Sequence, residues 1–394
     1  MEIRVAQRAA SIKPSPTLAV TAKAAELKAA GRDIIALSAG EPDFDTPEHI
    51  KEAATRAIRD GRTKYTAAGG MPELKQAVAD KFRRENGLAY EAQQILVSCG
   101  AKHSIYNLMQ ALLNPGDEVI VPAPYWVSYL DMPKLAGAEP VVVRAGIESR
   151  FKITGKQLAR SITDKSRLLM LNSPSNPTGV SYSGAELEDI AAALVEHPDI
   201  IILTDDIYEH ILWGQDDFKN IVNVCPELAG RTVVVNGVSK AYSMTGWRIG
   251  YLGGPASLVK AAQKIQSQST SNPSSVSQYA AVAALNGDQT YIRESTAIFK
   301  QRHDFVLAGL NSIDGVECTA SDGTFYSFPN MQGVINRLDG INNDVKLGEY
   351  LLEQAEVALV PGSAFGAKGY MRLSYATSME NLETAIARLR DALG

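Results

Sequence analysis

The chain has 394 residues, of which 45% are hydrophobic and 21% are charged, so a globular protein of about two domains is expected. Its net charge of -5 argues against a nucleic-acid-binding or membrane-surface protein. Three cysteines with neither a paired framework nor metal-ligand spacing, together with the lack of a signal peptide or a transmembrane run, predict a cytoplasmic protein without a metal site.

The N-terminal part of the chain predicts a short series of elements. Residues 1–16 are expected to form an irregular arm that ends in a proline-punctuated segment. A helix is predicted over 17–30, where the next residue is a glycine suited to end it. A short strand over 34–37 and helices over 47–60 and 72–86 follow.

Between residues 95 and 252 the chain alternates between short apolar runs and helical patterns or long connections. This rhythm predicts right-handed crossovers and a mostly parallel sheet covered by helices. We expect seven strands in one sheet, and the apolar runs that predict them are Ile95–Ser98, Glu118–Val121, Pro140–Val143, Arg167–Leu171, Ile200–Thr204, Thr232–Val235 and Ile249–Leu252.

Ligands bind beyond the carboxyl ends of the strands in such a sheet, so the residues at that edge can be named from the sequence. The run Thr232–Val235 ends in a glycine-containing turn that delivers Lys240, and Arg248 follows eight residues later. A lysine in an apolar, cation-rich pocket can lose its proton and form an imine with a carbonyl. A fixed arginine beside it can bind a phosphate. The pair therefore points to pyridoxal 5'-phosphate, an aldehyde that carries a phosphate.

Two further strand ends carry residues suited to the same cofactor. Asp205 directly follows a buried strand, where an unpaired carboxylate is costly, and pairing with a protonated ring nitrogen would satisfy it. The alternative, an N-cap of the next helix, stays open for Asp206. Asn176 and Tyr208 could hydrogen-bond the cofactor's phenolic oxygen, although Asn176 between two prolines also fits an ordinary turn.

The first two strands of the alternation end near two more candidates. Gly100 and Ala101 open a helix whose free N–H groups could bind a phosphate, or they form an ordinary turn between strand and helix. Trp126 could stack on a cofactor ring or belong to the core.

The C-terminal part predicts a smaller α+β unit. The serine-rich stretch 267–275 favours a solvated linker, and a long amphipathic helix over 291–312 follows it. Arg372 alternates with apolar residues, as an edge-strand charge does, or it could bind a substrate carboxylate in a cleft between domains. The remaining predicted elements are strands over 316–319, 324–328, 357–360 and 371–375 and helices over 345–355 and 379–393, the last with a capping box of Thr377 and Glu380.

These elements divide the chain into three segments. Residues 1–47 are expected to form the N-terminal arm and part of a small domain. Residues 48–290 are expected to form a large cofactor-binding domain, and residues 291–394 the small C-terminal domain.

Several motifs together resemble one family. The lysine segment at 239–250, Ser-Lys-Ala-Tyr-Ser-Met-Thr-Gly-Trp-Arg-Ile-Gly, closely resembles that of the class I/II pyridoxal-phosphate-dependent aminotransferases of fold type I. The motifs Gly-Glu-Pro-Asp-Phe, Lys-Tyr-Thr, Asn-Pro-Thr-Gly, Asp-Asp-Ile-Tyr-Glu and Arg-Leu-Ser-Tyr-Ala fall where that family has its other motifs. The resemblance covers the whole chain and is closest to the bacterial aspartate aminotransferase branch Ib.

The resemblance implies a role for each matching residue. Lys240 would carry the cofactor, Asp205 would pair with its ring nitrogen, and Asn176 and Tyr208 would bind its phenolic oxygen. Trp126 would stack on the ring, and Arg248, Ser239 and the Gly100 and Ala101 amides would bind the phosphate. Tyr65 would reach the phosphate of a neighbouring subunit, which implies a homodimer with shared active sites. Arg372 and the Gly40 backbone would hold the substrate α-carboxylate.

The resemblance also implies the substrates, which are amino acids and 2-oxo acids. In other branches of the family, an arginine in the region of 267–275 binds the distal carboxylate of the dicarboxylic substrate, but no arginine lies there in this chain. The Ib branch assigns that carboxylate to Lys102. Some Ib members also transaminate prephenate, with Lys13 in the arm as a candidate contributor. Aspartate or glutamate transamination with 2-oxoglutarate or oxaloacetate is therefore expected, and prephenate is an alternative main or second substrate.

Three other functions remain open at this point. A pyridoxal-phosphate-dependent β-lyase or decarboxylase would share nearly every residue named above. A nicotinamide-dependent reductase would need Gly-x-Gly-x-x-Gly after an early strand, and Cys99-Gly100-Ala101-Lys102 does not match it. A regulator with the same fold would carry a DNA-binding domain ahead of it, whereas this sequence starts directly at the arm.

Overall fold

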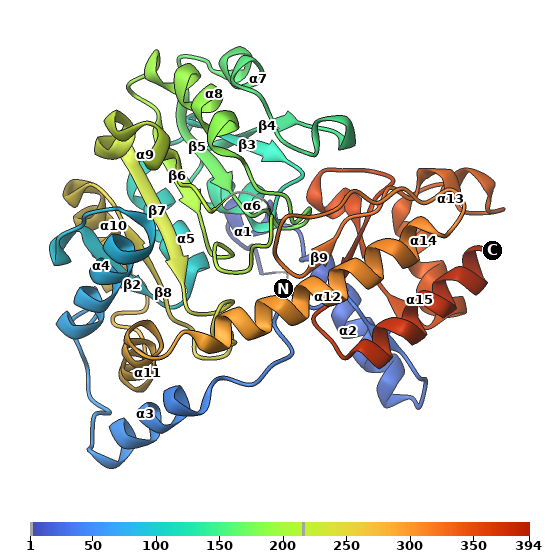
Figure 1. Ribbon diagram of the computed structural model, residues 1–394. Coiled ribbons are helices and arrows are strands. Elements are labelled where there is room, and N and C mark those ends of the chain that lie inside the picture. The colour runs from blue at the N-terminus through green and yellow to red at the C-terminus, as the bar shows by residue number, and fades with distance from the viewer. Residues whose placement is uncertain (1–2, 215–216) are drawn as a thin grey trace.

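The computed structural model describes residues 3–214 and 217–394, and its largest sheet has seven strands (Figure 1). Their order is β2-β8-β7-β6-β5-β3-β4. β8 runs antiparallel to both of its neighbours, and the other pairs are parallel. The predicted seven-stranded, mostly parallel sheet is confirmed, and its strands are β2 Ile95–Ser98, β3 Glu118–Ala123, β4 Glu139–Arg144, β5 Ser166–Asn172, β6 Ile201–Asp205, β7 Thr232–Gly237 and β8 Gly250–Gly253.

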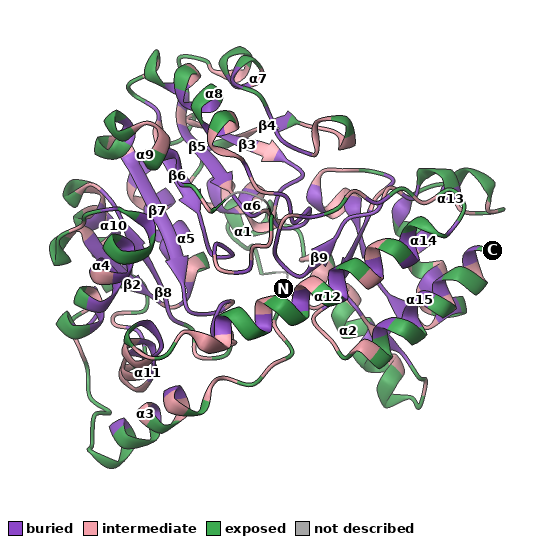
Figure 2. Ribbon diagram, viewed as in Figure 1, coloured by how far each residue is buried: buried purple, intermediate pink, exposed green. Residues whose placement is uncertain are grey.

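The sheet is covered by helices on both faces because its strands are apolar on both sides. In β7, Val233 and Val235 pack in one buried cluster and Val234 in another, as the two-residue period of a strand requires. β2, β7 and β8 are buried at every residue (Figure 2). One face is covered by α5 Ala101–Leu112, α6 Ser128–Leu135 and α10 Ala256–Ser269. The other is covered by α4 Pro72–Asn86, α7 Gly155–Ser161, α8 Gly184–Val195, α9 Ile221–Val224 and α11 Ser275–Asn286, and α3 Glu48–Arg59 packs against α11.

The C-terminal part packs around a separate core. The long helix α12 Thr290–Asn311 leads from the sheet region to it in Figure 1, with Ile292 in the first core and Phe299 and Val306 in the second. The N-terminal segment joins this part because β1 Ile35–Ala36 pairs with β10 Val357–Ala358. A three-stranded sheet, β11 Val360–Pro361, β12 Met371–Ser374 and β9 Tyr326–Ser327, is accompanied by α2 Pro16–Ala29, α13 Gln332–Arg337, α14 Asp344–Tyr350 and α15 Met379–Leu393.

Several local predictions are wrong. The serine-rich stretch is no linker, because α10 continues to Ser269 and Ser274 caps α11 by accepting a hydrogen bond from Ser277. Residues 316–319 form only an isolated bridge from Glu317 to Asn330. The arm contains a short helix, α1 Gln7–Ala10.

One predicted capping box is wrong, and the N-cap alternative left open for Asp206 is not realised. The N-cap of α15 is Ser378, whose side chain accepts from the Asn381 amide, so Thr377 and Glu380 form no capping box. Asp206 begins a turn and caps no helix, because the chain runs through turns from residue 207 to 210.

Candidate active site

A cavity of about 380 Å³ lies at the carboxyl ends of the parallel strands, where the second core meets the sheet. It is bordered by the ends of β5 and β6, the loop after β7, the first residues of α5 and the strand β12. The predicted site residues that line it are Gly40, Ala101, Lys102, Trp126, Asn176, Asp205, Tyr208, Ser239, Lys240, Arg248 and Arg372.

Lys240 follows β7 and points its amine into this cavity. Its Nζ donates a hydrogen bond to the Gly40 carbonyl and lies 5.8 Å from the centre of the Tyr208 ring. Desolvation by the surrounding protein, with smaller contributions from Arg372 and Arg248, lowers its pKa to about 8. The amine can therefore lose its proton within the pH range of most enzymes, which an exposed lysine cannot.

Asp205 is the last residue of β6 and is only 4% exposed. Its carboxylate accepts a hydrogen bond of 2.5 Å from the Tyr129 hydroxyl, and its backbone carbonyl accepts one of 2.8 Å from Asn172 Nδ2. Desolvation raises its pKa to about 6, and the hydrogen bond from Tyr129 opposes that rise. A buried carboxylate of this kind needs a cationic or protonated partner in the cavity.

Tyr208 and Tyr326 meet across the cavity from different parts of the chain. Their hydroxyl oxygens lie 2.9 Å apart, and burial raises the pKa of both. Gly40 lies against this pair, because a Cβ at its position would stand 3.0 Å from the Tyr326 oxygen. The backbone of residue 40 can approach the cavity closely only because it has no side chain.

The start of α5 forms a cationic corner of the cavity. Gly100 has a φ of +89°, and a Cβ there would collide with the Arg248 guanidinium. Among the described residues no side chain caps this helix. Its N–H groups and the nearby arginine therefore suit an anion such as a phosphate. Lys102 Nζ lies 4.6 Å from the centre of the Trp126 ring, and burial followed by Arg248 lowers its pKa.

Arg372 enters the cavity from β12 and is 2% exposed. Its two terminal nitrogens donate to Asn176 Oδ1 at 3.1 Å and to the Ser38 carbonyl at 2.7 Å. The guanidinium lies between the rings of Tyr326 and Phe365, at 4.6 and 5.0 Å from their centres. Its Nε has no hydrogen-bond partner among the residues that the structure describes. A buried guanidinium without a carboxylate partner is suited to bind one.

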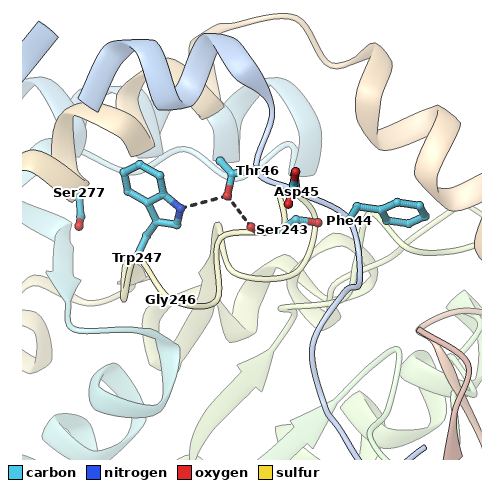
Figure 3. A pocket seen from close by; sticks show the side chains of 7 residues that line it. All are labelled: Phe44, Asp45, Thr46, Ser243, Gly246, Trp247 and Ser277. Atoms are coloured by element: carbon cyan, nitrogen blue, oxygen red, sulfur yellow. Dashed lines mark hydrogen bonds between the residues drawn. The ribbon is translucent and has the colours of Figure 1, made fainter. Parts of the chain in front are cut away.

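The loop between Lys240 and Arg248 is anchored from outside the cavity. In Figure 3, Trp247 Nε1 donates to the Thr46 hydroxyl at 3.0 Å, and that hydroxyl donates to the Ser243 carbonyl at 2.6 Å. Ser243 and Arg248 both have positive φ angles, of 49° and 55°. These contacts hold the strained loop in place, and they thereby fix the positions of Lys240 and Arg248 at its two ends.

The sequence model of the family described as "Aminotransferase class I and II" matches residues 32–389. The chain belongs to this family. An aspartate/prephenate aminotransferase of Nitrosomonas europaea is 56% identical over 99% of this chain and 100% of its own length. An aspartate aminotransferase of Rhizobium meliloti is 49% identical over 98% of this chain and 95% of its own length.

Solved aminotransferase structures have the same fold. The aspartate aminotransferase from Rhizobium meliloti superposes with a TM-score of 0.96 at 48% identity, covering 100% of this chain and 99% of that one. The aspartate aminotransferase from Thermus thermophilus with maleate gives 0.93 at 43% identity, covering 99% and 100%. The resemblance drawn from the sequence motifs, the fold class and the aminotransferase activity that it implied are thus confirmed.

Three predicted site residues of this aminotransferase do not line the cavity. Gly100 lies behind Arg248 at the start of α5. Tyr65 is 93% exposed and borders an open pocket together with Ser274. Lys13 lines a second cavity of about 410 Å³, adjacent to the first, and Lys102 is among the residues that line both.

The polar residues of the cavity that sequence reasoning did not assign to the site include Tyr129, Asn172 and Tyr326. Tyr129 lies three residues after Trp126 in the segment that follows β3, and its place beyond a strand end was an available signal. Tyr326 pairs with Ser374, two residues beyond Arg372, but only the register of the folded sheet shows this. Asn172 ends β5, where other strand ends had already been read as site positions.

The sequence predicted neither a metal site nor a membrane-spanning segment, and the structure bears on both points. Glu85, Glu209 and His210 bring possible metal ligands within 4.8 Å of one another, away from the cavity. Lys81 already pairs with Glu209 and lies 3.5 Å from Glu85, so a cation is part of this cluster. Of the helices in the described part of the chain, none is long and apolar enough to cross a bilayer.

Proposed function

We propose that this aminotransferase moves the amino group of aspartate or glutamate to a 2-oxo acid such as 2-oxoglutarate or oxaloacetate, with pyridoxal 5'-phosphate in the cavity. The observation that carries the proposal is the meeting of Lys240, Asp205 and Arg372 in one buried cavity. The names of the relatives from Nitrosomonas europaea and Rhizobium meliloti support the choice of substrate.

The side chains around the cavity fit this cofactor. The Lys240 amine has a lowered pKa, as bonding to an aldehyde requires. Asp205 is a buried carboxylate that needs a protonated partner, and the ring nitrogen of the cofactor would be one. The anion-binding start of α5 and Arg248 lie on the same cavity and suit a phosphate. Each part of the cofactor therefore has a matching group.

The cofactor, when bound, supplies an aldehyde for the amino group and a ring that withdraws electrons from the substrate Cα. Lys240, as a neutral amine, would take the proton from the substrate Cα and deliver it to the cofactor carbon that receives the amino group, and it would move a proton in the opposite direction in the second half-reaction. Asp205 would keep the ring nitrogen protonated. Arg372 would bind the α-carboxylate and orient the substrate, with the Gly40 carbonyl beside the lysine amine.

The other lining residues would position the cofactor. Asn176 and Tyr208 would bind the phenolic oxygen, and Trp126 would stack on the ring. The phosphate would be bound by Arg248, by Ser239 and by the amides of Gly100 and Ala101 at the start of α5. All of these residues except Gly100 line the one cavity, which supports the roles proposed for them.

The proposal extends to assembly, compartment and domains. Tyr65 is a highly exposed aromatic residue, which supports its placement in the site of a second subunit, so that the enzyme works as a homodimer with shared sites.

The three free cysteines fit a reducing cytoplasm. The two separate cores and the β1–β10 pairing support a large domain of residues 48–290 and a small one built from 291–394 and part of 1–47.

A second substrate, prephenate, is favoured by the adjacent cavity of about 410 Å³. Lys13 lies there, and Lys102 and Arg248 line both cavities. A dicarboxylic acid larger than aspartate could extend from Arg372 into this space and meet the arm. The flexible ammonium of Lys102 would bind the distal carboxylate of either acid, and it would constrain the position of that carboxylate less than an arginine would.

Replacement of Lys240 by alanine tests the central assignment. We expect loss of aspartate–2-oxoglutarate transamination, while the cofactor is still bound without a covalent bond. Borohydride reduction followed by mass spectrometry should fix the cofactor to the Lys240 peptide in the wild type only. Lys75→Ala is the matched control, because burial also lowers the pKa of Lys75 but it lies on α4 outside the cavity. Normal transamination by Lys240→Ala would refute the proposal.

A further inference from the structure

Tyr129 makes the closest side-chain contact of the Asp205 carboxylate. Its hydroxyl donates to Asp205 Oδ2 over 2.5 Å, and the two residues are 3% and 4% exposed. Tyr129 lies in the first turn of α6, so the bond joins this helix to the end of β6. Burial raises the pKa of Tyr129 well above its ordinary value, and the hydroxyl therefore stays a proton donor at every pH at which the enzyme works.

The other titratable groups that face Asp205 cannot replace this donor. Lys240 favours the ionised carboxylate less than the Tyr129 hydrogen bond does, and its own pKa is lowered to about 8. The Tyr208 hydroxyl is hydrogen-bonded to the Tyr326 hydroxyl, and Asp206 is a second buried acid whose own pKa is raised by burial and in part by Asp205. The Tyr129 hydroxyl thus opposes the desolvation of the carboxylate most strongly among the surrounding side chains.

The same tyrosine also contacts the aromatic residue predicted to stack on the cofactor. The rings of Trp126 and Tyr129 are 5.4 Å apart and meet edge to face at 88°. The Tyr129 amide donates to the Trp126 carbonyl at 2.9 Å. One residue therefore contacts both the group placed at the ring nitrogen and the group placed on the ring face.

We propose that Tyr129 is a positioning residue for the amino-group transfer: its hydroxyl keeps the Asp205 carboxylate ionised and directed at the ring nitrogen of pyridoxal phosphate. This inference rests on the proposed function, since Tyr129 acts only through Asp205. The hydrogen bond fixes one carboxylate oxygen, while the Asn172 amide fixes the backbone of the same residue. The carboxylate is then preorganised before the cofactor enters.

The test is Tyr129→Phe in the full-length enzyme, with the dissociation constant of pyridoxal phosphate measured across pH values on both sides of 6. Loss of the donor raises the pKa of Asp205 further above its ordinary value. The anionic form is then lost at a higher pH as the solution is acidified. A hydrogen bond to a charged group contributes about 1.5–3 kcal/mol, so binding at neutral pH should weaken about ten-fold or more. The pH at which cofactor binding weakens on acidification should rise by about one unit.

Two companion variants keep the result interpretable. Tyr182→Phe removes another buried tyrosine hydroxyl, which accepts from the Ile153 amide at 3.0 Å outside the cavity, and should leave the pH profile unchanged. Site-specific replacement of Tyr129 by 3-fluorotyrosine keeps the ring and strengthens the donor, so it should lower the pH at which cofactor binding weakens on acidification. This second change preserves packing even where the phenylalanine variant fails to fold.

Asp205→Asn separates this inference from the proposed function. If Asp205→Asn alters cofactor affinity and its pH dependence but neither Tyr129 variant does, Tyr129 has no positioning role and the inference is overturned. If Asp205→Asn itself binds the cofactor with the wild-type pH profile, the assignment of Asp205 falls, and the inference falls with it. Opposite shifts by the phenylalanine and fluorotyrosine variants would establish the role.

Discussion

Replacement of Arg372 by lysine should weaken substrate binding more than it slows the chemical step. The guanidinium is held by Asn176 and the Ser38 carbonyl and lies between two aromatic rings, so its fork is preorganised before a carboxylate arrives. Lysine keeps the charge but loses the planar fork, the Nε donor and the stacking. Lys240 and Asp205 remain in place, so proton transfer at the substrate Cα should change little.

The size of the effect follows from the contacts that are lost. A hydrogen bond between charged groups contributes about 1.5–3 kcal/mol, and each 1.4 kcal/mol corresponds to a factor of about ten in affinity. Loss of one bond of the fork should therefore raise KM for the amino acid and the oxo acid about 10- to 100-fold. Because KM mixes binding with later steps, the dissociation constant of maleate, the dicarboxylate named with the Thermus thermophilus structure, should be titrated as well and rise by a similar factor.

Arg302→Lys is the matched control. Arg302 is also a buried arginine, and it pairs with Asp43 through two bonds of 2.7 and 2.9 Å outside the cavity. This variant should lower the melting temperature while KM and maleate binding stay near the wild-type values. If Arg372→Lys lowers kcat with no change in KM or in maleate affinity, the arginine does not bind the substrate carboxylate, and the argument is wrong.

Three other predictions concern assembly and substrate range. Hybrid dimers of Tyr65→Ala and Lys240→Ala chains should contain one intact site and recover activity above either parent, and confirmed hybrids without recovery would contradict a shared site. Lys102→Ala should raise KM about ten-fold or more for aspartate and glutamate but leave alanine nearly unchanged, since a charge-assisted contact is lost only for the distal carboxylate. Lys13→Ala should reduce kcat/KM for prephenate more than for oxaloacetate. Equal losses for both acids would show that the arm does not take part in substrate recognition.

The sheet and the main residues at its edge were predictable because their signals are local. An apolar run such as Thr232–Val235 can be buried on both faces only in a covered sheet, and parallel strands bring their carboxyl ends to one edge. Asp205 is the last residue of β6 and Lys240 lies in the short turn after β7, so the position of each strand fixes the position of the residue. The N-terminal and C-terminal helices likewise carry their periodicity in consecutive residues.

The remaining contacts depend on partners far away in the sequence. Arg372 meets Asn176 across 196 residues and Ser38 across 334, and Tyr208 meets Tyr326 across 118. No local pattern encodes such pairs, because they arise when the second core closes on the sheet. The serine-rich stretch was misread for a related reason: Ser274 is polar because it caps a helix, and the capped helix is visible only once its apolar face packs on α3.

The chemistry of the site follows from burial at the sheet edge more than from any single residue type. The same desolvation that lowers the pKa of Lys240 to about 8 raises that of Asp205 to about 6. Burial disfavours the charged form of both groups, so a base and an acid that would lie far from neutrality in water are drawn toward it. The two charges also favour one another's ionised form, and Arg372 and Arg248 oppose the charge on the lysine. A lysine poised to lose its proton and a carboxylate that needs a protonated partner thus come from one structural cause, the ending of two buried strands at a common edge.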